Sequence, residues 1–291
     1  MSSVFVLLQY LLPQHLISRI TAKLAQGRFL KNQFIRAFVR RYRVDLSESR
    51  IEDIRQFENF NAFFTRQLKP GLRPLAGDID AVLCPADGAI SQLGHISNNN
   101  LLQAKGRLFS LPALLGGDAQ MATLFQEGCF ATVYLSPRDY HRVHMPLAGR
   151  LLKMIYIPGD LFSVNRVTAK SVANLFSRNE RVVCLFQTEV GPMALVLVGA
   201  MIVAGIETVW SGQVCPSAGS RTIRLSDFTD NSPAIEFVSG VEMGRFKLGS
   251  TVIALFAHGA MNLNSELAAD SPVRMGQLLG RINDSSKKDN L

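Results

Sequence analysis

The sequence has few cysteines, and the four it contains are far apart. Cys84, Cys129, Cys184 and Cys215 form no CxxC pair. This spacing argues against a zinc cluster and against the dense disulfide framework of small secreted domains. We therefore expect reduced, mostly buried thiols and no bound metal.

Long apolar runs are also scarce. The best candidate, residues 190–206, is bounded by glutamates and broken by glycine and proline. It is typical of two buried strands rather than of a membrane helix, which needs about 20 apolar residues. Residues 1–18 make a poor signal peptide, because the basic residues follow the apolar run instead of preceding it. We expect a chain that lies on a membrane without crossing it.

Acidic residues are absent from the first 43 positions. These positions hold eight basic residues: Arg19, Lys23, Arg28, Lys31, Arg36, Arg40, Arg41 and Arg43. The formal net charge is +8, so the remainder of the chain carries 23 basic and 23 acidic residues and is neutral. The basic character therefore belongs to an N-terminal arm and not to the whole protein surface.

Large apolar residues separate the charges of this arm. Leu16, Ile20 and Leu24 recur at helical spacing, and a second segment over residues 30–42 places its apolar residues on one broad face. Lys31 and Arg41 fall inside that face, where their long stems can reach outward. The pattern favours helices at an anionic membrane surface over a nucleic-acid site. The alternative is an amphipathic helix packed on the protein's own core.

The remaining sequence predicts an α+β fold with a mostly β body. Ser49 and Glu52 form a capping-box pattern that predicts a helix toward Leu68. Short apolar runs divided by glycine and proline follow from about residue 80: 81–83, 129–135, 151–157, 181–186, 193–203, 222–225, 234–238 and 251–256. We expect an N-terminal helical, membrane-associating region over residues 1–70 and a catalytic β-rich domain over residues 71–291.

The pair Gly249 and Ser250 can support unusual backbone chemistry. If the chain bends sharply there, the Ser250 hydroxyl can attack the preceding carbonyl and convert the amide to an ester. Removal of the Ser250 α-proton would then break the chain and lead to a pyruvoyl group. Taken alone, such a pair is usually a turn. A phosphate-binding loop over residues 244–251 is the other interpretation, but Ser250 stands where its lysine belongs and a strand pattern follows.

Two of the five histidines lie in the segment YLSPRDYHRVHMP, residues 134–146. The prolines at its ends disfavour a long helix, so His141 and His144 should point apart and do separate work. The pair could also be half of a zinc site, but no third ligand lies nearby. Asp87 in the turn PADG is a candidate carboxylate partner for one imidazole, and Asp139 and Asp160 compete with it.

Together these segments resemble the phosphatidylserine decarboxylase family, in its bacterial, membrane-associated branch. The resemblance covers most of residues 60–256. It rests on FTRQLK at 64–69, PADG at 85–88, the histidine segment, PGDLFSVN at 158–165, NLFSRNER at 174–181 and GRFKLGST at 244–251.

The resemblance implies a proenzyme that cuts itself between Gly249 and Ser250, leaving a β chain that ends at residue 249 and an α chain that begins with a pyruvoyl group. The family's self-cleavage relay maps onto Asp87, His144 and Ser250. His141 maps onto a residue used in decarboxylation, and Ser163 onto a residue that contacts the substrate headgroup. The implied reaction converts phosphatidylserine to phosphatidylethanolamine through a Schiff base.

The resemblance also sets expectations for partners and location. We expect a peripheral protein on the cytoplasmic side of the cell membrane, a homo-oligomer of the processed two-chain unit, and no nucleic-acid partner. One rival is a membrane-associated serine hydrolase that uses Asp87, His144 and Ser250 on an external ester and stays uncut. A non-enzymatic lipid-binding module would leave the histidine segment unexplained.

Overall fold

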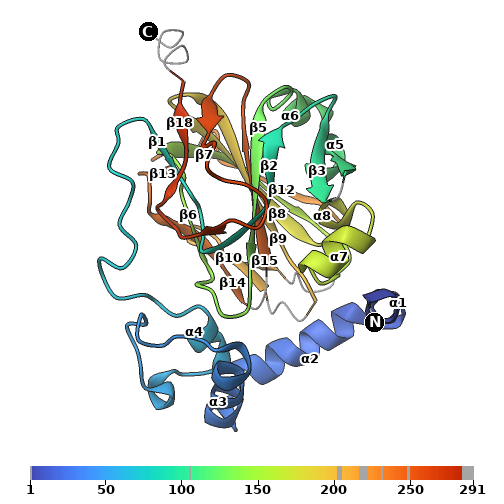
Figure 1. Ribbon diagram of the computed structural model, residues 1–291, viewed down its shortest axis with the longest axis vertical. Coiled ribbons are helices and arrows are strands. Elements are labelled where there is room, and N and C mark those ends of the chain that lie inside the picture. The colour runs from blue at the N-terminus through green and yellow to red at the C-terminus, as the bar shows by residue number, and fades with distance from the viewer. Residues whose placement is uncertain are drawn as a thin grey trace.

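Helices gather at the N-terminus, and strands build most of the remaining chain (Figure 1). The computed structural model describes residues 2–104, 106–201, 205–215, 222–230, 232–247 and 250–283. The first helices are α1 (Ser2–Leu11), α2 (Gln14–Gln26), α3 (Lys31–Tyr42), the 3-10 helix η1 (Ile54–Gln56) and α4 (Phe60–Phe64). Figure 1 shows α2 extended beside the β body, with α1 near α7.

The predicted helix from Ser49 toward Leu68 is wrong. Ser49 instead pairs with Leu68 in an isolated β-bridge. The side chain of Asp53 accepts a hydrogen bond from the N–H of Arg55 and begins the short helix η1. The side chain of Asn59 accepts from the N–H of Ala62 and begins α4. Each cap favours the start of a new short helix, because its side chain accepts a hydrogen bond from a backbone N–H that has no partner within the helix.

Helices α2 and α3 leave much apolar surface uncovered. Leu16, Ile20 and Leu24 on α2 are 56, 50 and 60% exposed, whereas Ile35 on α3 is fully buried against α4. Lys31 turns inward and donates to the carbonyl oxygens of Arg55 and Phe57, so it does not reach outward as its position in the apolar face suggested. Within the described part of the chain, every helix falls short of the length and apolar content needed to cross a bilayer.

The body is organised around a nine-stranded antiparallel sheet with the order β12-β7-β8-β9-β15-β5-β2-β17, to which β13 adds by pairing with β7. Its strands are β2 (Gly88–His95), β5 (Cys129–Leu135), β7 (Gly149–Ile157), β8 (Arg181–Thr188), β9 (Gly191–Val198), β12 (Arg224–Asp227), β13 (Glu236–Phe237), β15 (Ser250–Phe256) and β17 (Pro272–Val273). This sheet and the N-terminal helices confirm the predicted α+β fold.

Both faces of the large sheet are buried, which explains its nearly continuous apolar strands. Side chains alternate across β15, so Val252 and Ala254 belong to one core cluster and Ile253 to the other. One face is covered by β3 (Asn100–Ala104), β4 (Arg107–Ser110) and the short helices α5 (Leu111–Leu114), α6 (Ala119–Thr123), α7 (Arg166–Ser171) and α8 (Leu175–Arg178).

Two small sheets cover the opposite face. One has the order β1-β18-β16, and the other has the order β11-β10-β14-β6. Their strands are β1 (Ala81–Leu83), β6 (Arg142–His144), β10 (Gly205–Thr208), β11 (Gly212–Cys215), β14 (Glu242–Lys247), β16 (Met261–Leu263) and β18 (Leu278–Ile282). The four cysteines are free and buried, as predicted.

Candidate active site

Ser250 begins β15 at one end of the large sheet. It pairs with Leu135 at the end of β5, and the next residue, Thr251, pairs with Val198 at the end of β9. The Ser250 side chain is fully buried, and its Oγ has no hydrogen-bond partner among the described residues. A buried polar group without a partner costs free energy, so such groups concentrate where chemistry requires them. Gly249, the other half of the predicted junction, lies outside the described residues.

The alternation along β15 directs Ser250 toward the small sheet that contains β6 and β14. Ser250 lies on the same face as Val252, which belongs to one apolar cluster with Val143 of β6 and Phe246 of β14. The predicted histidine segment joins β5 to β6 and runs into that sheet. Strands also occupy both sides of residues 248–249, so Ser250 opens no helix, and the phosphate-loop interpretation is wrong.

His141 lies beside the strand that leads toward Ser250. Its backbone oxygen accepts a hydrogen bond from the N–H of Phe246 at 3.0 Å. Its Nδ1 donates to the backbone oxygen of Asp139 at 2.8 Å, which leaves the lone pair on Nε2. That Nε2 is buried and has no hydrogen-bond partner in the part of the chain that the structure describes. Burial lowers the pKa of His141 to about 3, so the imidazole is neutral near neutral pH in this arrangement.

His144 differs from His141 because both of its ring nitrogens are engaged. Its Nδ1 donates to the Gly240 backbone oxygen at 2.8 Å, and its Nε2 accepts from the Tyr140 hydroxyl at 3.1 Å. Burial lowers the pKa of this imidazole too. Sequence reasoning missed Tyr140, although it belongs to the histidine segment. His144 could act as a base only after the Tyr140 hydroxyl moves away from Nε2.

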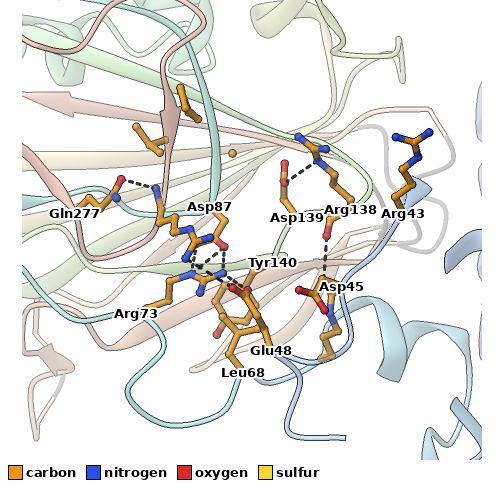
Figure 2. Close-up of a pocket in the computed structure, with 15 residues that line it drawn as sticks. Arg43, Asp45, Glu48, Leu68, Arg73, Asp87, Arg138, Asp139, Tyr140 and Gln277 are labelled. Carbon is orange, nitrogen blue, oxygen red and sulfur yellow. Dashed lines mark hydrogen bonds and ion pairs between the residues drawn. The ribbon is translucent and has the colours of Figure 1, made fainter. Parts of the chain in front are cut away.

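Asp87 is held by an arginine from outside the sheet. Its carboxylate accepts bonds of 3.0 and 2.5 Å from Nε and Nη2 of Arg73, and one of 2.9 Å from the Met275 N–H. Arg73 also binds Glu48 at 2.7 Å, and Figure 2 shows this three-residue cluster in one part of a pocket. Nothing in the sequence pattern signalled Arg73, because its partner lies 14 residues away.

Asp87 and Ser250 nevertheless reach the same end of the sheet. Asp87 directly precedes β2, and β5 lies between β2 and β15. Two strand spacings separate their backbones, which is about 10 Å. Among the described residues, no hydrogen bond joins Asp87, His144 and Ser250 to one another. The assignment of these three residues to one relay therefore stays a prediction.

The competing carboxylates have separate partners. Asp139 accepts a hydrogen bond of 2.7 Å from the N–H of Ser136, and burial raises its pKa. Through its backbone oxygen it also positions His141. Asp160 pairs with Arg178 at 2.9 Å and lies in the connection between β7 and β8.

Ser163 contacts the N-terminal helices through its backbone. Its N–H donates to Oε1 of Gln9 in α1 at 2.7 Å. The neighbouring Phe162 binds the Asn179 side chain, which also donates to the Gly199 oxygen at the end of β9. Because β9 pairs with β15, this chain of contacts places the Ser163 segment at the sheet end that carries Ser250.

Known proteins resemble this chain over nearly its whole length. A family model described as phosphatidylserine decarboxylase matches residues 60–281, and one described as PSD matches residues 4–43. A protein named phosphatidylserine decarboxylase proenzyme from Ectopseudomonas mendocina is 59% identical over 278 residues, covering 95% of this chain and 97% of the relative. Proteins of the same name from Pseudomonas aeruginosa and Pseudomonas putida are 58% and 57% identical, covering 94% and 96% of this chain and 96% and 97% of the relatives.

Proposed function

The chain belongs to the phosphatidylserine decarboxylase family, and we propose that its precursor cuts itself before Ser250 and then converts phosphatidylserine to phosphatidylethanolamine. The reaction and the proenzyme character come with the family. The roles of individual residues are our proposal. The observation that supports them best is the buried, unpartnered hydroxyl of Ser250 on the sheet face shared with the histidine segment. The relatives give no support to a serine hydrolase.

The self-cleavage needs no reagent from outside the protein except water. The Ser250 Oγ attacks the carbonyl carbon of Gly249, and the peptide C–N bond breaks to give an ester. A base removes the α-proton of Ser250, and elimination releases the Gly249 carboxylate and leaves a dehydroalanine. Addition of water and loss of ammonia convert this residue to a pyruvoyl group. His144 and Asp87 are the residues that we assign to proton removal, and the Tyr140 hydroxyl must leave Nε2 of His144 first.

The surroundings of Ser250 fit such a group. The site is buried and lined by apolar residues of the core, which limit the amount of water around a reactive carbonyl. Once formed, the pyruvoyl carbonyl supplies the electron sink that decarboxylation needs. Our proposal gives His141 the task of exchanging a proton through Nε2, which has no partner among the described residues. Because burial keeps this imidazole neutral, the bound substrate must raise its pKa before it can hold that proton. Ser163 would contact the substrate headgroup.

We also propose that α2 and α3 bind the membrane surface on the cytoplasmic side. The exposed Leu16, Ile20 and Leu24 form an apolar stripe beside basic residues, which suits an anionic interface. The two helices and Phe60 enclose an apolar groove of about 400 Å³ that could admit an acyl chain. Self-association of the processed two-chain unit stays a prediction.

The intact mass of purified protein tests the central proposal. The unsubstituted chain should give two fragments divided between residues 249 and 250, and the smaller should carry a ketone at its N-terminus. Ser250→Ala should stay whole and inactive, because it lacks the attacking hydroxyl. Ser163→Ala is the matched control and should be cut normally while its activity falls. Active material recovered as one uncut chain would refute the proposal.

A further inference from the structure

A pocket rich in arginine lies between the segment that follows α3 and the part of the histidine segment that joins β5 to β6. Its volume is about 460 Å³. Five arginines line it: Arg43, Arg66, Arg73, Arg138 and Arg274. Four carboxylates line it as well: Asp45, Glu48, Asp87 and Asp139. Figure 2 shows Arg73 between Asp87 and Glu48, with Arg138 and Asp139 in another part of the pocket.

These carboxylates are engaged by groups other than Arg66. Glu48 and Asp87 both bind Arg73. Asp139 accepts the Ser136 N–H and lies 3.9 Å from Nε of Arg138. Asp45 accepts the N–H of Ser47 at 2.8 Å. The pocket therefore contains four carboxylates, and each of them contacts a group other than Arg66.

Arg66 is the unusual member of this set. It is only 5% exposed, and its Nη2 donates to the backbone oxygen of Arg138 at 3.0 Å. Its Nε and Nη1 are buried without a hydrogen-bond partner, and it forms no ion pair within the described part of the chain. Burial lowers the pKa of its guanidinium. The carboxylates of Asp87, Asp139 and Glu48 attract this guanidinium through space, but none of them accepts its free N–H groups. Buried donors without a partner are costly, so an anion that accepts from Nε and Nη1 would be favourable here.

Arg66 also lies close to the reacting region. It follows Phe64 by two residues, and the Phe64 ring lies 4.0 Å from the His141 ring, centroid to centroid. The positive charge of Arg66 contributes to the lowered pKa of His141, which requires the two groups to be near each other. An anion bound at Arg66 would therefore lie beside the histidine segment.

We propose that Arg66 binds the phosphate of the phospholipid headgroup; this inference rests on the proposed function. The phosphate is the anionic group that substrate and product share. The substrate carboxylate is a poorer candidate, because an arginine that holds it would stabilise the ground state over the decarboxylation transition state. The guanidinium suits a phosphate oxygen because it is permanently charged and weakly hydrated.

Substrates with and without the phosphate test this assignment. Arg66→Met and Arg66→Lys should be cut normally, as judged by intact mass. With phosphatidylserine in detergent micelles, Arg66→Met should raise KM by roughly tenfold or more, since a charge-assisted hydrogen bond is lost. With O-dodecylserine, which keeps the amino-acid head and an apolar chain but lacks phosphate, KM should not change. Arg281→Met is the control, because that exposed arginine lies outside the pocket, and both KM values should stay within about twofold.

The outcomes separate this inference from the proposed function. Equal losses on both substrates, or no loss on phosphatidylserine, would overturn the role of Arg66 while leaving cleavage at Ser250 intact. An unsubstituted chain that is never cut would instead refute the proposed function. If Arg66→Met does not fold, Arg66→Lys tests the same point, because its ammonium keeps the charge but lacks the planar set of donors. Its KM should rise for phosphatidylserine, by less than for Arg66→Met, and should not change for O-dodecylserine. Glycerol phosphate should inhibit the unsubstituted enzyme competitively, and absence of inhibition would count against the site.

Discussion

At the scale of single residues, His141, which directly precedes β6, and His144, which ends β6, are chemically distinct although they are three positions apart. Both are buried and neutral, but Nε2 of His141 is free whereas Nε2 of His144 accepts the Tyr140 hydroxyl. The free lone pair therefore belongs to the residue assigned to decarboxylation. The residue assigned to self-cleavage needs a side-chain movement before it can act as a base.

The depressed pKa of His141 should make folding stability depend on pH. Between about pH 6.5 and pH 3, the unfolded chain binds a proton at this residue and the folded chain does not. The free energy of unfolding should therefore fall on acidification through this window, by at most about 1.4 kcal/mol per pH unit for one group. Urea unfolding of Ser250→Ala, which avoids a cut chain, should show a steeper loss from pH 7 to pH 5 than Ser250→Ala with His141→Gln.

His95→Gln in the same background serves as the control, because His95 is exposed at the end of β2. It should leave the pH dependence unchanged. Equal slopes for the His141 and His95 variants would mean that the folded protein does not exclude a proton from His141.

The ion pair between Arg73 and Asp87 should contribute to the folding stability of the protein as well as position Asp87. Both side chains are at least nine-tenths buried, and Arg73→Met would leave the Asp87 carboxylate without its cation. Removing one partner of a buried pair typically costs about 3–5 kcal/mol. Urea unfolding in the Ser250→Ala background should show a loss of that order. Arg281→Met, which breaks exposed ion pairs with Asp78 and Asp80, should cost much less, and similar losses for the two variants would contradict this account.

At the scale of elements, continuous apolar runs were the most informative part of the sequence. The predicted strands over residues 81–83 and 129–135 match β1 and β5, and residues 190–206 contain parts of two strands as expected. The helix predicted from Ser49 failed because two local caps competed with a weak periodic pattern. Arg66, Arg73 and Tyr140 were not assigned a role from sequence, since their importance comes from partners distant in the chain or from the absence of a partner.

The exposed face of α2 predicts how the protein meets a membrane. The triple variant Leu16→Ser, Ile20→Ser and Leu24→Ser should bind vesicles of phosphatidylcholine and phosphatidylglycerol much more weakly in a flotation assay, because it removes apolar area from the interface. High salt should weaken binding of the unsubstituted protein by screening the basic arm. Self-cleavage should stay normal, since these residues are distant from the Ser250 junction in sequence and are exposed.

A matched triple on the β body provides the control for that experiment. Ile79, Leu108 and Val238 are 93, 57 and 65% exposed, and replacing them with serine removes similar apolar surface elsewhere. This variant should float like the unsubstituted protein. If both triples lost vesicle binding equally, general surface hydrophobicity rather than α2 would account for it.

At the scale of the whole molecule, the two chains produced by cleavage contribute neighbouring strands to the same sheets. Cleavage before Ser250 would leave β15 at the start of the small chain, between β5 and β9 of the large chain, with all seven residues buried. The small chain also supplies β17 to the same sheet and β18 to the sheet that contains β1. Its strands complete two sheets and cannot leave without exposing both cores.

The processed protein should therefore behave as one folding unit held together without a covalent link. The two chains should elute together from a gel-filtration column even after extensive dilution, and they should separate only in denaturant. An isotopically labelled small chain added to folded enzyme should not exchange into it, because exchange requires withdrawal of a central strand and loss of its backbone hydrogen bonds. Ser250→Ala should elute at the same volume, since the backbone cut changes connectivity and not packing. Ready dissociation or exchange under native conditions would show that β15 is not held between β5 and β9 in the mature enzyme.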